Sequence, residues 1–173
     1  VLAWNTNTYS DDKAPKSWAD FFDPEKFPGK RAYRNKVSGA LEPAIMADGV
    51  ATADVYKELD SEEGINRAIE RIRKLKPHIA VFWKSGAQHA QLMKDGEVAL
   101  TTGWNGRFDN AAKDGAKVAY GFNQALLDYD CFAIPKGAPN KDTAMEFLGV
   151  ISQAKYQANL PLHITYGPTN KAA

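Results

Sequence analysis

Short apolar runs alternate with amphipathic stretches along most of this chain. The clearest amphipathic stretch covers residues 62–76: its apolar side chains recur at three-and-four spacing, Ser61 stands at the N-cap position, and Pro77 ends the pattern. Further stretches with helical features cover residues 40–47, 54–59, 85–94, 108–113, 140–151 and 153–160. Apolar runs that predict strands cover residues 1–5, 30–33, 79–83, 97–102, 117–121 and 131–135. Strands that alternate with helices in this way predict an α/β fold.

The same pattern separates core positions from surface positions. A helix is expected to begin at Ser17, and its aromatic residues Trp18, Phe21 and Phe22 are predicted to pack in the core. Cys131 stands in an apolar run and is predicted to be a small buried hydrophobe.

Composition narrows the class of protein. The 173 residues are 44% hydrophobic and 25% charged, which is ordinary for one globular core. The net charge is only +1 and no basic cluster is present, so the sequence gives no support to a nucleic-acid partner or to an anionic membrane surface. No apolar run approaches the roughly 20 residues that span a bilayer.

Neither metal binding nor catalysis has a signature in this sequence. His78, His89 and His163 are far apart, and the single Cys131 adds no second ligand, so no metal site is predicted. No nucleophile elbow, phosphate-binding loop or zinc-protease motif occurs. The sequence therefore predicts no cofactor and no catalytic residue.

A ligand site is predicted where two apolar runs meet polar residues. Trp104 and Arg107 follow the run 97–102, and Asp130 precedes the run 131–135. If the two runs form neighbouring strands, these three side chains share one rim, where open α/β sheets bind their ligands. Two ordinary alternatives stay open, because a Trp after a strand often packs in the core and an Arg–Asp pair is often a structural salt bridge.

A second stretch offers neutral donors. The predicted strand 30–33 runs through Asn35 and Ser38 into the helix 40–47. A helix N-terminus presents free N–H groups that accept an anion or a hydroxyl, and Ser38 either joins that site or simply caps the helix.

Four segments, in this order, resemble a known family: PKSWADFFDPEKFPGK, KDGEVALTTGWNG, LDYDCFAIPKGAPNKDTAMEFLGVIS and ITYGPTNKAA. They look like the spermidine/putrescine branch of the bacterial extracellular solute-binding proteins, the periplasmic receptors of ABC importers, and the resemblance covers essentially all 173 residues. It implies a type II periplasmic-binding-protein-like α/β lobe, with a mixed sheet flanked by helices. Residues 1–131 are expected to form the second lobe, which lines the ligand cleft. Residues 132–173 are expected to return towards the first lobe, whose opening portion is expected to be absent, as is the end of the second lobe.

The resemblance assigns ligand contacts residue by residue. Trp104 matches an aromatic residue that packs on ligand methylenes, and Asp130 matches a carboxylate that binds a ligand ammonium. Further acidic residues of the family fall near residues 35–39, where this chain has Asn35 and Ser38 but no acid. Arg107 stands where polyamine receptors have a small neutral residue. Since a polyamine would meet repulsion there, a changed specificity is expected.

These features lead to one functional expectation and three alternatives. The chain is expected to be a periplasmic binding lobe that captures an ω-amino acid such as γ-aminobutyrate (GABA), with an ABC-importer permease as partner and without catalytic activity. Its unpaired apolar surface is expected to meet the missing first lobe or a swapped copy. The alternatives are polyamine binding, a small-molecule enzyme with Asp128 or Asp130 as general acid or base, and a purely structural fragment.

Overall fold

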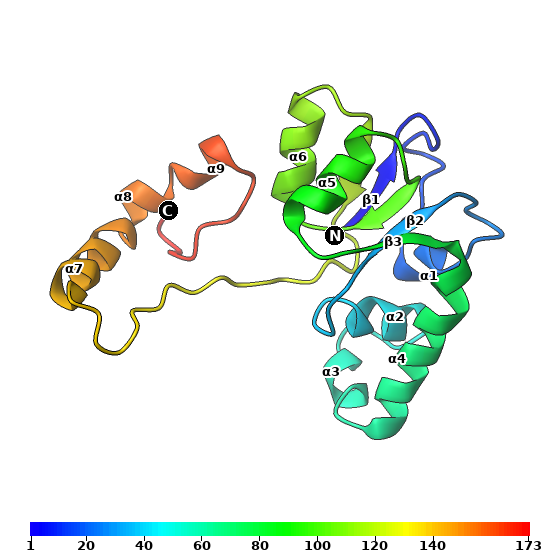
Figure 1. The fold of residues 1–173 in the computed structure, drawn as a ribbon, viewed down its shortest axis with the longest axis horizontal. Helices are drawn as coiled ribbons and strands as arrows, with labels where there is room; N and C mark the ends of the chain where they lie inside the picture. Colours follow the sequence, from blue (N-terminus) through cyan, green and yellow to red (C-terminus); the bar gives the residue numbers. More distant parts are fainter. The chain divides into compact units, whose positions relative to one another are not determined.

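The computed structural model describes all 173 residues (Figure 1). The chain divides into two units, residues 1–126 and 127–173. A five-stranded mixed sheet lies at the centre of the first unit. The strands are β1 (Leu2–Asn5), β2 (Arg31–Arg34), β3 (Ile79–Trp83), β4 (Leu100–Thr102) and β5 (Val118–Gly121), in the order β3-β2-β4-β1-β5. β2 is parallel to β3 and β4, whereas β1 runs antiparallel between β4 and β5. Four strands, β2 to β5, therefore end at the same side of the sheet, which we call the C-terminal edge.

Helices cover both faces of the sheet. They are α1 (Trp18–Phe21), α2 (Leu41–Ala47), α3 (Val55–Glu58), α4 (Glu62–Leu75), the 3₁₀ turn η1 (Lys76–His78), α5 (Gly86–Lys94) and α6 (Asn105–Lys113). Figure 1 shows α5 and α6 side by side on one side of the sheet and α2 and α4 on the other. Strand side chains alternate between the two faces: Leu2 and Trp4 join the core with α2 and α4, and Ala3 joins the core with α6. The predicted α/β architecture is confirmed.

Three serines begin helices as predicted. Ser17, Ser61 and Ser85 each accept a hydrogen bond from the backbone N–H three residues ahead, which satisfies one of the free donors of the first turn. The aromatic residues after Ser17 are buried in the core, as predicted.

A buried arginine holds the loop that leads into β2. Arg31 is fully buried, and its guanidinium donates to four backbone carbonyls, among them those of Phe21 at 2.8 Å and Gly29 at 2.7 Å. A buried cation is costly unless its donors are satisfied. Arg31 therefore has a structural role, at the start of the same strand that ends in Arg34.

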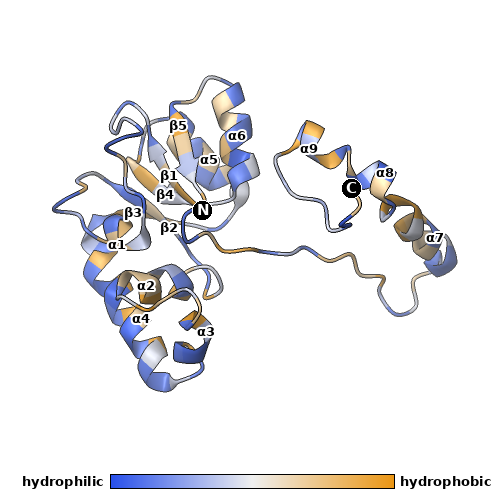
Figure 2. Ribbon diagram, turned by 180° about the vertical axis from the view of Figure 1, so that it is seen from behind, coloured by the Kyte–Doolittle hydropathy of each residue, from blue (hydrophilic) through white to orange (hydrophobic).

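The second unit contains α7 (Lys141–Ile151), α8 (Ala154–Gln157) and α9 (Leu160–His163). None of these helices has a buried residue, and Figure 2 shows hydrophobic residues along α7 and α9. The strand predicted over residues 131–135 does not form, and Cys131 is exposed, so both predictions were wrong. An apolar run becomes a strand only where a neighbouring strand pairs with its backbone, and here no strand does. No helix in the structure has the length and apolar character that crossing a membrane requires.

Candidate functional site

Arginine and tryptophan side chains that could contact a ligand lie at the C-terminal edge of the sheet. Arg34 ends β2, Trp83 ends β3, and Trp104 follows β4. Because the three strands are parallel neighbours, these residues meet although they are distant in the sequence. The expected neighbour of β4, the run 131–135, takes no part in the sheet. The rim is formed by β2 and β3 instead.

Four rings form an aromatic cluster on the face covered by α5 and α6: Trp83, His89, Trp104 and Phe108. The ring centroids of Trp83 and His89 are 4.7 Å apart, those of His89 and Phe108 are 4.8 Å apart, and Trp104 lies 5.5 Å from both Trp83 and His89. Trp83 also donates from Nε1 to Thr102 Oγ1 at 3.1 Å. Three of the rings are buried, whereas Trp104 is half-buried.

Trp104 packs against the other rings but is only half-buried, so its role in ligand binding stays a prediction. It is the N-cap residue of α6, which begins at Asn105 rather than at residue 108, and part of its ring packs against the cluster. A Cβ at Gly86 would lie 2.8 Å from Cζ3 of Trp104 and 3.3 Å from Nε of Arg107. Only a glycine lets the first turn of α5 approach these two side chains so closely. The rest of the indole is accessible as a surface for a ligand.

Two guanidinium groups flank Trp104. Arg107 is exposed in the first turn of α6, beside Gly86. Arg34 is half-buried, and its Cζ lies 5.3 Å from the ring centroid of Trp104 and 5.8 Å from that of Trp83. The sequence reasoning missed Arg34. Its signal was its position as the last residue of a strand whose parallel neighbour leads to Trp104.

The pKa of His89 depends on burial and on the positive charges beside Trp104. Burial, followed by the positive charges of the N-terminal amine, Arg107 and Arg34, lowers the pKa of the imidazole from 6.5 to about 3. The ring is therefore neutral, and its Nε2 accepts a long hydrogen bond of 3.5 Å from the Trp104 backbone N–H. Two of the three cations that act on His89 are the arginines beside Trp104.

The stretch after β2 lies at the same edge. Asn35 and Ser38 are both exposed there. Ser38 does not cap α2, because the N-cap is Ala40 and no side chain caps it. The backbone N–H of Gly39 instead donates to Glu42 Oε2 at 2.8 Å. Ligand contacts from Asn35 and Ser38 stay predictions.

The predicted carboxylates belong to the other unit. Asp128 and Asp130 are exposed in a segment without regular secondary structure. A contact between Asp130 and a ligand ammonium therefore stays a prediction. No group of three or more His, Cys, Asp or Glu side chains is arranged to hold a metal ion.

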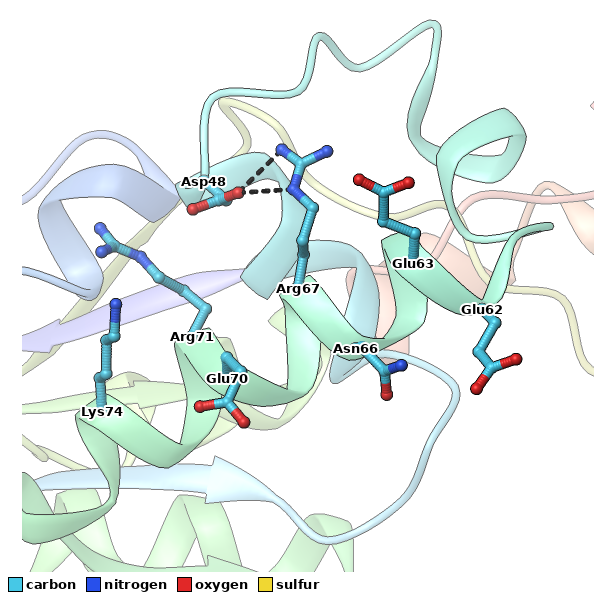
Figure 3. A pocket seen from close by; sticks show the side chains of 8 residues that line it. All are labelled: Asp48, Glu62, Glu63, Asn66, Arg67, Glu70, Arg71 and Lys74. Atoms are coloured by element: carbon cyan, nitrogen blue, oxygen red, sulfur yellow. Dashed lines mark hydrogen bonds and ion pairs between the residues drawn. The ribbon is translucent and has the colours of Figure 1, made fainter.

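A separate hollow of about 650 Å³ lies on α4 (Figure 3). Its lining is almost entirely charged, and Arg67 in it pairs with Asp48 at 2.8 Å and, outside the lining, with Glu58 at 3.0 Å. It offers no aromatic surface to a ligand. We therefore place the candidate site at the C-terminal edge.

Known proteins are similar to this chain in sequence and in fold. The family model of the bacterial extracellular solute-binding proteins matches residues 1–173. A gamma-aminobutyric acid-binding protein of Pseudomonas aeruginosa is 41% identical over 171 residues, which cover 99% of this chain and 48% of that protein. The chain thus spans about half the length of this relative.

Solved structures of other proteins are also similar to this chain. The periplasmic binding protein MotA of A. tumefaciens B6, in complex with glucopine, is 46% identical with a TM-score of 0.89, over 99% of this chain and 53% of that one. A GABA receptor is 33% identical with a TM-score of 0.77, over 99% and 52%. The periplasmic-binding-protein-like fold expected from the sequence is confirmed, and the chain belongs to the bacterial extracellular solute-binding protein family.

Proposed function

We propose that this chain forms the solute-capturing part of a periplasmic receptor of an ABC importer, and that its solute is an ω-amino acid such as GABA. The observation that carries the proposal is a half-buried Trp104 beside an exposed guanidinium, Arg107, at the C-terminal edge of parallel strands. An indole surface packs on methylenes, and a guanidinium fork binds a carboxylate. The 41% identity to a GABA-binding protein supports the same ligand class.

Polyamines fit this site less well. Arg34 and Arg107 flank the indole, and the ion pairs of the structure join other residues. A di- or tri-cation meets like charge there, which opposes its binding. We propose that Asp130 receives the single ammonium of the amino acid, as the sequence resemblance implies, and that Asn35 and Ser38 add neutral contacts.

The groups at the same site support reversible capture without chemistry. Trp104, Arg34 and Arg107 offer binding groups, and the neutral, buried His89 is surrounded by rings rather than placed to exchange protons with a solute. An enzyme that used Asp128 or Asp130 as acid or base would turn its substrate over. Recovery of unchanged GABA after long incubation tests this alternative.

The test of the ligand class is calorimetric. The receptor polypeptide that carries these residues is titrated with GABA, glucopine, putrescine and spermidine. GABA is expected to bind, and Arg107→Ala is expected to weaken it by about 10–100-fold through loss of the carboxylate fork. Trp104→Ala is expected to cost about 1–3 kcal/mol of binding. Arg73→Ala on α4, which removes a surface arginine paired with Glu70, is the control.

Two results would contradict the proposal. One is tight polyamine binding that survives or improves in Arg107→Ala, without binding of GABA. The other is Trp104→Ala with unchanged affinity and a large fall in melting temperature, which would make Trp104 a core residue only. Glucopine binding without GABA binding would move the ligand to that of MotA.

A further inference from the structure

Arg34 and Arg107 differ from Arg31, Arg67 and Arg73 in how their donors are used. Arg31 donates to backbone carbonyls, Arg67 pairs with two carboxylates, and Arg73 pairs with Glu70. Arg34, by contrast, is in no ion pair: its half-buried guanidinium lies over the rings of Trp104 and Trp83 and beside Gly39. Guanidinium groups that are held close to rings but have no anionic partner are well suited to bind anions.

Two acids on neighbouring elements have other partners. Glu42 on α2 accepts the backbone N–H of Gly39, the glycine against which the Arg34 guanidinium packs. Asp109 on α6 pairs with Lys113 at 2.8 Å. None of the ion pairs of the structure includes Arg34 or Arg107.

Both guanidinium groups, those of Arg34 and Arg107, also lie beside the same residue, Trp104. Gly86 places Arg107 Nε and the Trp104 ring against the same turn of α5, while Arg34 lies over that ring. The depressed pKa of His89, to which both arginines contribute after burial, agrees with their convergence. A solute on the exposed part of Trp104 therefore meets a guanidinium from β2 and another from α6.

We propose that Arg34 and Arg107 each bind one acidic group, so that among γ-amino acids related to GABA the site prefers those that carry a second carboxylate. One carboxylate, as in GABA, leaves one guanidinium without a partner. A second carboxylate on the ligand gives each fork a bidentate partner. This inference rests on the proposed function, and it makes Arg34 a specificity-determining residue.

Three matched ligands test the proposal. L-Glutamate has two carboxylates, GABA lacks its α-carboxylate, and L-glutamine replaces the side-chain carboxylate by a neutral amide of the same shape. Affinities are measured by calorimetry on the receptor polypeptide that carries these residues. Glutamate is expected to bind at least about 10-fold more tightly than GABA and glutamine, since it alone satisfies both forks.

Three variants test whether Arg34 causes the preference for glutamate over GABA. Arg34→Gln is expected to weaken glutamate by about 10-fold or more and GABA by less than about threefold, which abolishes the preference. Arg34→Lys keeps the charge without the fork and is expected to lose the preference in part. Lys84→Gln removes a positive charge from the loop after β3, the neighbouring strand, without touching either guanidinium, and is expected to keep it. Melting temperatures of all variants check that they fold.

The inference is overturned if GABA binds as tightly as glutamate, or if Arg34→Gln weakens both equally, since both guanidiniums would then hold one carboxylate. It is overturned as well if Lys84→Gln acts like Arg34→Gln, because only the general field would matter. In each case GABA still binds and the proposed function stands. If none of the three ligands binds, both fall.

Discussion

His89 is a histidine whose environment forbids its charged form. It is fully buried between aromatic rings, and its Nδ1 has no hydrogen-bond partner. Burial and nearby cations lower its pKa to about 3, whereas an unfolded chain leaves it at 6.5. Between about pH 3 and pH 6.5, the His89 imidazole is protonated in the unfolded state but neutral in the folded state. Stability from the neutral imidazole is therefore complete above pH 6.5 and is lost as the pH falls towards 3.

We expect the folded chain to lose about 2–3 kcal/mol more between pH 7 and pH 4.5 than His89→Gln does, because the amide has no proton to gain. Urea unfolding at both pH values measures this difference. All four tryptophans lie in residues 1–126, so their fluorescence reports on that unit alone. Equal pH dependence in the two proteins would mean that His89 is already protonated or solvated in the fold.

At the scale of elements, the site depends on how closely α5 approaches the start of α6. Ser85 caps α5, and Gly86 follows directly, so the first turn of the helix lies against Trp104. A larger residue at position 86 would improve helix propensity slightly and push the indole away. The glycine therefore sets the position of the ligand surface.

Gly86→Ala is expected to weaken ligand binding by about 10-fold or more while changing stability by about 1–3 kcal/mol at most, because a Cβ would displace Trp104 and Arg107. Gly149→Ala in α7 is the matched control, since its Cβ meets no atom within 4 Å. Calorimetry and thermal melting compare the two. Unchanged affinity in Gly86→Ala would show that the indole position is unimportant for the solute.

Elements governed by local rules could be predicted from the sequence. The caps at Ser17, Ser61 and Ser85 follow from side chains next to the N–H groups they satisfy. The run 131–135 was misjudged, because strand formation depends on a partner that the run itself does not specify. Within the candidate site, Trp104 and Arg107 were proposed from their position after an apolar run, and both lie beside Gly86. Arg34 was missed because only the parallel pairing of β2 with β4 brings it to Trp104.

At the scale of the whole molecule, the second unit exposes many large apolar side chains, and a stable monomer seldom leaves a large apolar patch uncovered. Large apolar side chains of this unit are exposed: Leu127, Phe132, Met145, Phe147, Val150, Leu160 and Leu162. The chain covers about half of its relatives. We propose that this surface meets the remaining first-lobe segment of the receptor or, in the 173-residue chain, a second copy.

The 173-residue chain is accordingly expected to self-associate, and Phe147→Glu is expected to weaken the association by about 10-fold or more, since a charge would enter an apolar contact. Sedimentation equilibrium measures the association. Tyr56→Glu in α3 is the control, because Tyr56 is equally exposed but lies in the first unit. A wild-type chain that stays monomeric at all accessible concentrations would contradict this expectation.

The place of β1 in the sheet has a kinetic consequence. The strand that opens the chain lies between β4 and β5, with Leu2 opposite Thr102 on one side and Gly121 on the other. Closing such long loops costs entropy before the pairing repays it. During synthesis, the first strand must stay unpaired until the residues of β4 and β5 have emerged. We therefore expect the pairing of β1 with β4 and β5 to be among the last steps in the folding of the first unit.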